Sequence, residues 1–307
     1  MKRIGDKIGQ TVIWMTAAVI VLLMLLFLVM LTTESGLSIQ RFSWRFLVTS
    51  TWDPVHLIFG ALPFLYGTVV TSVFAIIFAG IVGIPSAVFL VYVAGNRLRT
   101  WLGALIELLA AIPSVVYGLW GLFVLVPWLQ NTGEPFLAKT LGFLPLFRGM
   151  PVGVGYLAAG IILSIMILPT ITSLTRDILL TVPNELHEGA YALGATSYEM
   201  IRSVVLPYAR TGIIGALMLA LGRAFGETIA VTMVIGNRPE ISGSLFSPGY
   251  TMASVIANEF TEATSQIYLS SLYEVGLVLL IFTVVFYALA RLLVARMMTY
   301  RKGGASE

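Results

Sequence analysis

Three ionisable side chains lie inside long apolar stretches of this sequence, namely Glu107, Arg223 and Glu227. A charged side chain at the centre of a bilayer costs about 2.5–3.5 kcal/mol or more unless it is paired or hydrated, so each is a candidate for function. An arginine offers several donors in a planar fork and keeps its charge at any working pH. It therefore suits a tetrahedral oxyanion, and a nearby carboxylate can neutralise it when the anion is absent.

Arg223 and Glu227 belong to the segment GRAFGETIAVTMVIGN, residues 222–237. Their spacing of four residues predicts that both side chains lie on one helix face and form an ion pair. Gly222 and Gly226 flank Arg223 at a small-x-x-x-small spacing, which allows a neighbouring backbone to approach closely. We expect Arg223 to line a path through the membrane and to meet an anion there, with Glu227 as its resting partner. A buried structural ion pair is the alternative interpretation.

Glu107 and a further carboxylate, Glu274, lie near the ends of apolar stretches. Glu107 either faces the same path or reaches the membrane interface, because it lies close to the start of its stretch. Glu274 lies at the edge of the last stretch, and we expect it to be interfacial. Pro85, Pro113 and Pro169 interrupt apolar stretches and predict kinks, which serve either as gates or as static packing features.

The composition determines which elements hold these side chains. Of 307 residues, 58% are apolar and 11% are charged, against about 45–50% and 25% in soluble domains. The chain is therefore predicted to be an all-α integral membrane protein, a single domain over 1–307 whose first apolar stretch is a retained anchor. Six stretches are long enough to cross a bilayer: 12–31, 67–93, 104–129, 155–175, 211–235 and 273–295.

The basic residues of the connecting segments predict the orientation. With a cytoplasmic N-terminus, twelve fall on the cytoplasmic side: Lys2, Arg3, Lys7, Arg97, Arg99, Arg176, Arg202, Arg210, Arg291, Arg296, Arg301 and Lys302. Five fall on the other side: Arg41, Arg45, Lys139, Arg148 and Arg238. Cytoplasmic segments of membrane proteins are enriched in Lys and Arg, so both termini and the loop 176–210 are expected in the cytoplasm. The basic residues are spread over short loops, and nothing in them indicates nucleic-acid binding.

The loop 176–210 contains signals for a first short helix over 183–193. Pro183 is a good first-turn residue, and Glu185 and Glu188 place negative charge near the N-terminus of that helix. Gly194 can adopt the left-handed conformation that ends it.

A second helix is predicted directly after the turn. Thr196 and Glu199 have the spacing of a capping box, and apolar residues then recur at helical spacing until Pro207 interrupts them. Such a helix–turn–helix loop is too polar for lipid, and it can insert apolar side chains into a groove on another protein. A hairpin that rests on the membrane surface is the alternative.

Several kinds of chemistry are excluded by what the sequence lacks. No lysine follows a glycine in a G-x-x-x-x-G-K pattern, so ATP hydrolysis would come from another chain. The chain has no cysteine, and its two histidines, His56 and His187, do not form a ligand cluster, so no metal site is expected. The apolar stretches also lack the residue pairs of an intramembrane protease. Enzyme activity in this chain alone is not expected.

Four segments resemble the PstC-type permease subunits of bacterial and archaeal phosphate ABC importers: 107–123, 188–207, 222–237 and 256–263. The resemblance covers essentially the whole chain and implies a type I ABC importer permease fold in the cytoplasmic membrane, with a coupling loop for an ATPase. Gly189 departs from the general loop pattern, which has alanine there, but both residues are small. The coupling positions implied are Glu188, Gly189, Ala190, Gly194, Leu206 and Pro207.

The resemblance also implies partners and a mechanism. The partners would be a homologous PstA-type permease, two PstB-type ATPase subunits that carry ATP and Mg²⁺, and a PstS-type phosphate-binding protein outside; this chain itself would bind no cofactor. Alternating access would then import phosphate, with residues 237–271, including a helix over 251–263, as the docking surface. Alternatives are a permease for sulfate, molybdate or phosphonate, a phosphate-status sensor or scaffold, and a secondary transporter or channel that works alone.

Overall fold

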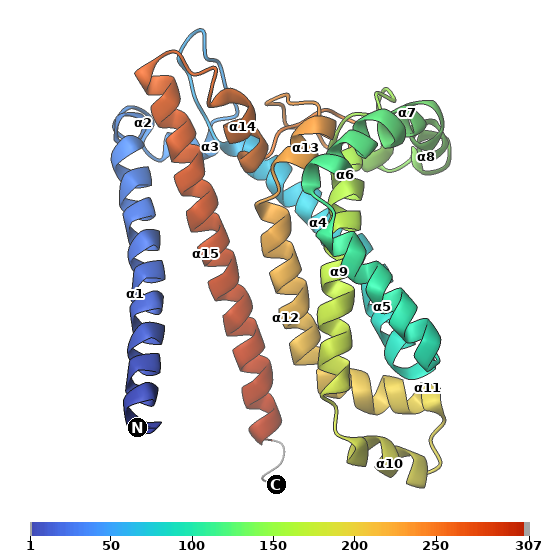
Figure 1. Cartoon of the computed structure of the whole chain (residues 1–307). Helices are drawn as coiled ribbons and strands as arrows, with labels where there is room; N and C mark the ends of the chain where they lie inside the picture. Colours follow the sequence, from blue (N-terminus) through green and yellow to red (C-terminus); the bar gives the residue numbers. More distant parts are fainter. Residues whose placement is uncertain (1, 304–307) are drawn as a thin grey trace.

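The computed structural model describes residues 2–303, and nearly all of the regular structure in this part of the chain is helical (Figure 1). The helices are α1 (Lys2–Glu34), α2 (Gly36–Phe42), α3 (Arg45–Val48), α4 (Leu62–Val88), α5 (Asn96–Ala111), α6 (Ser114–Trp120), α7 (Val126–Trp128), α8 (Glu134–Leu141), α9 (Tyr156–Leu180), α10 (Asn184–Ala192), α11 (Ser197–Met200), α12 (Leu206–Phe225), α13 (Ile229–Val234), α14 (Met252–Glu259) and α15 (Gln266–Gly303). Short π-helical segments continue several of them: Phe89–Val93, Gly121–Leu125, Leu129–Gly133 and Ile201–Val205.

Six continuous helical stretches in the described part of the chain are long and apolar enough to cross a membrane, and each overlaps one of the expected ranges. They are Gly9–Glu34, Leu62–Val93, Ser114–Leu141, Tyr156–Leu180, Ser197–Phe225 and Gln266–Leu292. The third expected stretch, 104–129, is not one helix: Ile112 and Pro113 are extended and separate α5 from α6. Pro113 produces this break because proline keeps the preceding residue out of the helical region.

Helix α9 is the centre of the bundle. Ile162, Leu163, Ile167 and Ile171 are completely or almost completely buried, and α9 packs along the length of α4. Helices α5, α12 and α13 also pack on α9. A largely apolar helix that contacts several neighbours in this way provides a rigid support for the side chains it carries.

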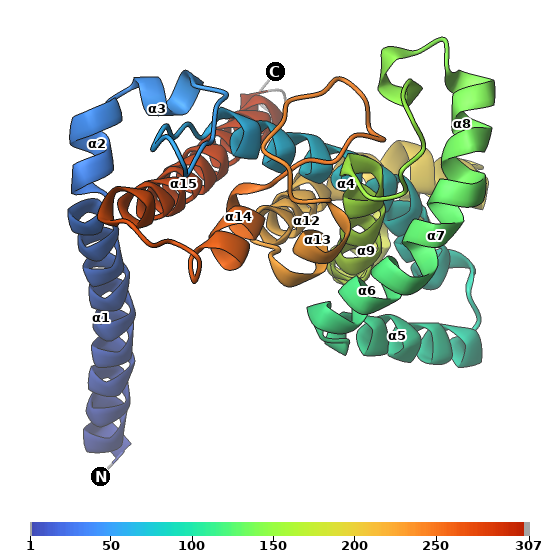
Figure 2. The ribbon, with the colours of Figure 1, turned by 90° about the horizontal axis from the view of Figure 1, so that it is seen from above.

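The two ends of the bundle differ in structure. Helices α10 and α11 lie at the end where α1 begins and α15 finishes, which we call the two-helix end (Figure 1). Helices α2, α3, α7, α8, α13 and α14 lie toward the opposite end, which we call the α14 end (Figure 1). Helix α1 stands at one side of the bundle and packs on α15 and α2 (Figure 2).

The α14 end has an aromatic core of its own, which joins part of the segment expected to dock a binding protein, 237–271, to residues before and within α4. Trp52 Nε1 and the Tyr268 hydroxyl both donate to Glu259 Oε2, each at 2.7 Å. The Tyr250 ring packs edge-on against Phe64 in the same cluster. Glu259 therefore ties the segment before α4 to α14 and α15, and the expected helix over 251–263 is the shorter α14.

Glu274, expected at the membrane interface, is covered by protein. Its side chain is buried on α15, and its Oε2 atom has no hydrogen-bond partner in the described part of the chain. Nearby, Ser271 Oγ lies 3.1 Å from Ser38 Oγ, and Ser270 Oγ donates to the Glu34 carbonyl at 2.6 Å. Helix α15 thus holds the α1–α2 junction through a buried polar cluster, in which Glu274 lies on the inner face of α15.

Candidate functional site

Arg223 lies in the last turn of α12, and its side chain is exposed. Its Nη1 atom donates to Thr170 Oγ1 of α9 at 3.3 Å. The other guanidinium donors have no hydrogen-bond partner among the residues that the structure describes. A partly satisfied guanidinium on an open face within the membrane-crossing bundle is suited to receive an anion.

The structure contradicts the predicted pairing of Arg223 with Glu227. Helix α12 ends at Phe225, so Glu227 lies beyond the helix and not one turn further along it. Glu227 Oε1 instead accepts from the Ala230 backbone N–H, at 3.4 Å, at the start of α13. No ion pair joins Arg223 to Glu227 in the described chain, so a carboxylate does not neutralise Arg223 in this state.

Two glycines near the break between α12 and α13 are closely packed. A side chain at Gly118 of α6 would meet Ala230 and Met233 of α13, so the glycine lets α13 lie against α6. A side chain at Gly222 would meet the Tyr287 hydroxyl of α15. Gly222 thus admits a neighbouring side chain, and not the neighbouring backbone that the glycine spacing predicted.

Thr170 is the residue of this site that sequence reasoning missed. It follows Pro169 on α9, and its hydroxyl donates no hydrogen bond to another described residue. Two residues later, Thr172 Oγ1 donates to the Leu168 carbonyl at 2.9 Å, as helical threonines commonly do. The Thr170 hydroxyl therefore keeps its proton available beside Arg223. A threonine in an apolar helix is so common that the sequence alone offered no signal.

Glu107 is not brought to this site. Its carboxylate lies 3.8 Å from Arg176 Nη1 of α9, and its side chain is 68% exposed. Arg176 also pairs with the neighbouring Asp177 at 3.1 Å. Such an exposed pair contributes little to stability, because solvent screens it.

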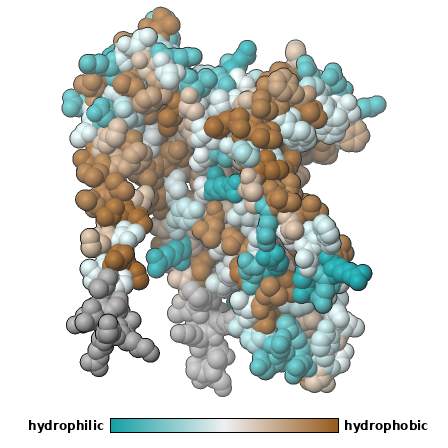
Figure 3. Space-filling model, in the orientation of Figure 1, coloured by the Kyte–Doolittle hydropathy of each residue, from teal (hydrophilic) through white to brown (hydrophobic). Residues whose placement is uncertain are grey.

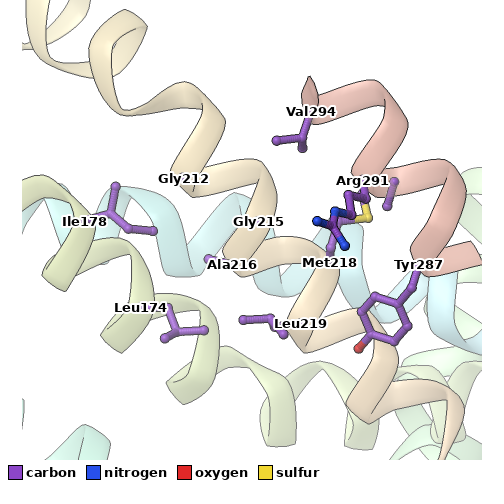
Figure 4. A pocket seen from close by; sticks show the side chains of 11 residues that line it. Leu174, Ile178, Gly212, Gly215, Ala216, Met218, Leu219, Tyr287, Arg291 and Val294 are labelled. Carbon is purple, nitrogen blue, oxygen red and sulfur yellow. The ribbon is translucent and has the colours of Figure 1, made fainter. Parts of the chain in front are cut away.

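A groove adjoins the Arg223–Thr170 contact on the side of the two-helix end. It has a volume of about 400 Å³ and lies between α9, α12 and α15 (Figure 4). Its walls are almost entirely apolar, and Arg291 and Tyr287 of α15 are the polar side chains among the lining residues. Arg291 extends from α15 into the space beside α12 (Figure 4).

The two-helix loop at the other end of α12 has the predicted local structure. Helix α10 begins after Pro183 and ends at Ala192, and Gly194, two residues further on, has a positive φ of 82°. At the start of α11, Thr196 Oγ1 accepts from the Glu199 N–H, and the Glu199 carboxylate accepts from the Thr196 N–H at 2.8 Å. The capping box predicted from the sequence is therefore confirmed.

The prediction that Pro207 ends the second helix is wrong. The π-helical segment Ile201–Val205 precedes it, and the Leu206 N–H bonds to the Ile201 carbonyl. This wider turn accommodates the proline ring and its missing N–H. One helical rod consequently runs from Ser197 to Phe225, with the capping box at one end and Arg223 at the other.

The predicted coupling positions lie on both the buried and the exposed side of the loop. Ala190 is buried in a small core with Val182 and Met200, whereas Glu188 and Gly189 are exposed. Leu206 is half-buried, and Gly194 and Pro207 are exposed. The tip presents apolar side chains to solvent, with Leu193 91% and Tyr198 67% exposed. In Figure 3 hydrophilic residues are frequent at the lower right, where Figure 1 places α10 and α11, and hydrophobic residues predominate at the left, where it places α1.

The bundle of six membrane-crossing helices, with a helix–turn–helix loop at one end, has the fold of a type I ABC importer permease. A chain of the MetNI methionine ABC transporter has this fold, with a TM-score of 0.58 and 18% sequence identity over 80% of the present chain and 99% of that chain.

The present chain belongs to the family of binding-protein-dependent transport system inner membrane components, whose profile matches residues 79–299. It is 48% identical over 286 residues to a phosphate transport system permease protein PstC of Mesorhizobium japonicum, covering 91% of this chain and 88% of that protein. The PstC of Haemophilus influenzae is 44% identical over 92% of this chain and 90% of that protein. The chain is thus a multi-pass membrane transport subunit.

Proposed function

We propose that this chain is the permease subunit of an ATP-driven importer of inorganic phosphate. The observation that carries the proposal is the exposed, partly satisfied guanidinium of Arg223 in an otherwise apolar bundle. Its relatives named as phosphate transport permeases support phosphate as the anion. Phosphate fits Arg223 through paired N–H donors, and Thr170 can both donate to a phosphate oxygen and accept from a protonated one.

In this proposal the chain forms half of the translocation path and a PstA-type permease forms the other half. Arg223 faces away from the core of its own chain, which suits a site completed by a second subunit. Two PstB-type ATPase subunits bind the two-helix loop from the cytoplasm, with ATP and Mg²⁺ held on those subunits. The apolar tip at Leu193 and Tyr198 supports this contact, because exposed aliphatic and aromatic side chains at a loop tip favour insertion into a groove.

The mechanism is alternating access driven through the rod Ser197–Phe225. ATP binding draws the two ATPase subunits together and moves the two-helix loop with them. Because α11 and α12 form one continuous helix, this movement reaches Arg223. A PstS-type binding protein delivers phosphate at the α14 end, and hydrolysis resets the permease. Both termini lie in the cytoplasm, as the distribution of basic residues supports.

The test is uptake of labelled phosphate into proteoliposomes that contain this chain, the partner permease and the ATPase, with the binding protein outside. We expect uptake that requires every component and resists excess sulfate and molybdate. Uptake of sulfate, molybdate or phosphonate in place of phosphate would assign another oxyanion. A complex that hydrolyses ATP without moving any of these anions would indicate a phosphate-status sensor, and gradient-driven uptake without the ATPase would indicate a secondary transporter.

A further inference from the structure

The groove between α9, α12 and α15 continues the helix faces that carry the anion site. On α9, Thr170 is followed at four-residue intervals by Leu174 and Ile178, and both of these line the groove. On α12, Leu219 and Gly215 precede Arg223 at the same interval and line the opposite wall. Residues four apart lie on one helix face, so the groove begins directly below the Arg223–Thr170 contact.

The groove leads toward the two-helix end. Gly212 is its lining residue on α12 farthest from Arg223, eleven residues back, which corresponds to about 16 Å along the helix axis. A side chain added at Gly215 would meet nothing within 4 Å, so open space exists at that point of the wall.

Arg291 is the only charged side chain among the residues that line this groove. It extends toward α12, is exposed, and has no hydrogen-bond or ion-pair partner among the residues whose side chains the structure describes (Figure 4). Tyr287, one turn earlier on α15, lies over Gly222 next to Arg223. Apolar walls focus the field of this charge along the groove, while solvent at the exposed guanidinium screens part of it.

We propose that the groove is the exit half of the path and that Arg291 is a second, transient binding site for the transported oxyanion. The inference rests on the proposed function for the direction of transport, but it specifies a new site. An anion released by Arg223 moves past Tyr287 to Arg291 and from there into water. Apolar walls with a single charge hold an anion weakly, which favours release.

The test uses the absence of cysteine from the chain, because an introduced thiol is then the only one in this subunit. Gly215→Cys is placed in the assembled transporter, alone and together with Arg291→Gln. Its modification by a sulfonate-bearing and by a trimethylammonium-bearing methanethiosulfonate is followed from the mass of the intact subunit. Gly95→Cys, in the exposed turn before α5 where an added side chain also has open space, is the matched control.

We expect the anionic reagent to be preferred at Gly215→Cys, and Arg291→Gln to lower that preference about tenfold through loss of the nearby charge. At Gly95→Cys the preference should not change. Millimolar inorganic phosphate should slow the modification at Gly215→Cys and lose this effect with Arg291→Gln. An unchanged preference would overturn the proposal. Failure of both water-soluble reagents to react would also overturn it, because the groove would then be filled by lipid.

Two further arms separate this inference from the assignment of phosphate. If sulfate slows the modification and phosphate does not, the anion-binding site at Arg291 is supported and the assignment of phosphate as the substrate is contradicted. In uptake assays, Arg291→Gln should lower the maximal rate about three- to tenfold and leave the half-saturating concentration of binding protein unchanged. Arg291→Lys should retain most of the rate, and Arg97→Gln, an exposed charge outside the groove, should retain all of it. A shift confined to the half-saturating concentration would contradict the exit role.

Discussion

The two-helix loop and the Arg223 region lie at opposite ends of one rod, Ser197–Phe225, and they are organised in different ways. The loop is specified by neighbouring residues, through the left-handed Gly194 and the Thr196–Glu199 capping box. The Arg223 region depends on residues far away in the chain, namely Thr170 on α9 and Tyr287 on α15.

The comparison suggests that the two ends of the rod have different roles. The loop packs through a buried core around Ala190 and Met200 that also includes Ala87 of α4 and Leu179 of α9. In the proposed mechanism, a displacement of the loop is therefore transmitted to closely packed helices. Arg223 keeps unsatisfied donors on an open face, as the proposed contact with an anion or with a second subunit requires. A rod of 29 residues is about 43 Å long, enough to connect an ATPase outside the membrane to a site within it.

The largest effect is expected from Arg223→Gln, which alters one end of the rod and leaves the loop at the other end unchanged. Uptake should fall about 100-fold, because charged hydrogen bonds to the anion contribute about 1.5–3 kcal/mol each. The complex should still assemble, since the loop is untouched. Labelled phosphate uptake and co-purification of the ATPase measure the two properties in one preparation. Near-normal uptake would remove Arg223 from the path, and Arg223→Lys shows how much of the effect depends on charge alone.

The converse experiment is Leu193→Glu, at the 91% exposed tip of the loop. We expect the amount of ATPase that co-purifies to fall about 30-fold, because a charge replaces an apolar anchor at the centre of the contact. The modification preference at Gly215→Cys should stay the same, since the groove is not altered. Leu193→Met keeps an apolar tip and is the matched control. If Leu193→Glu bound ATPase normally, the tip would lie outside that interface.

The same contrast explains how far the sequence predicts the structure. Composition and apolar length identify six crossing helices, because each must satisfy its own backbone in lipid. The loop is predicted almost to the residue, because glycine turns and capping boxes are local interactions. Pro207 is the exception, since the compensating π-helical segment Ile201–Val205 has no sequence signal.

The site in the membrane is predicted less well for a physical reason. After the break at Phe225, α13 packs on Gly118 of α6, which is more than a hundred residues away in the chain. Spacing within one segment therefore predicted an Arg223–Glu227 pair that does not form. Arg223 itself was recognisable, because a lone arginine in an apolar stretch is costly. Thr170 and the burial of Glu274 became visible only from contacts between helices.

A smaller effect is expected at the start of the rod. Thr196→Ala removes the side chain that accepts from the Glu199 N–H, and loss of such a cap costs about 1 kcal/mol. Helix α11 should fray and transmit movement less well, so coupled uptake should fall by about half an order of magnitude while basal ATP hydrolysis persists. Hydrogen exchange at residues 197–200 reports the fraying directly. Thr196→Ser should restore both readouts, and an unaltered exchange rate would show that the cap is dispensable.

The smallest effect concerns a turn at the α14 end that belongs to neither region. Asp53 accepts from the His56 ring at 2.6 Å and from the backbone of Val55, and these hydrogen bonds lower the pKa of Asp53 below its ordinary value of 3.8. A carboxyl whose pKa is lowered in the folded state stabilises the fold above its unfolded pKa and loses that contribution as the pH falls through the folded pKa.

We therefore expect the amide protection of residues 53–58 to be constant from pH 7 to about pH 4 and to decrease below it. Asp53→Asn should remove this decrease. Because Asp53 is solvent-exposed, the change should stay within the turn, where the Asp53 and Ile58 backbones are paired. Protection in the rod Ser197–Phe225 should not follow the same curve. If it did, protonation of Asp53 would change the stability of the rod, so the turn and the rod would be coupled. The rod would then not act on the proposed anion site independently of the α14 end.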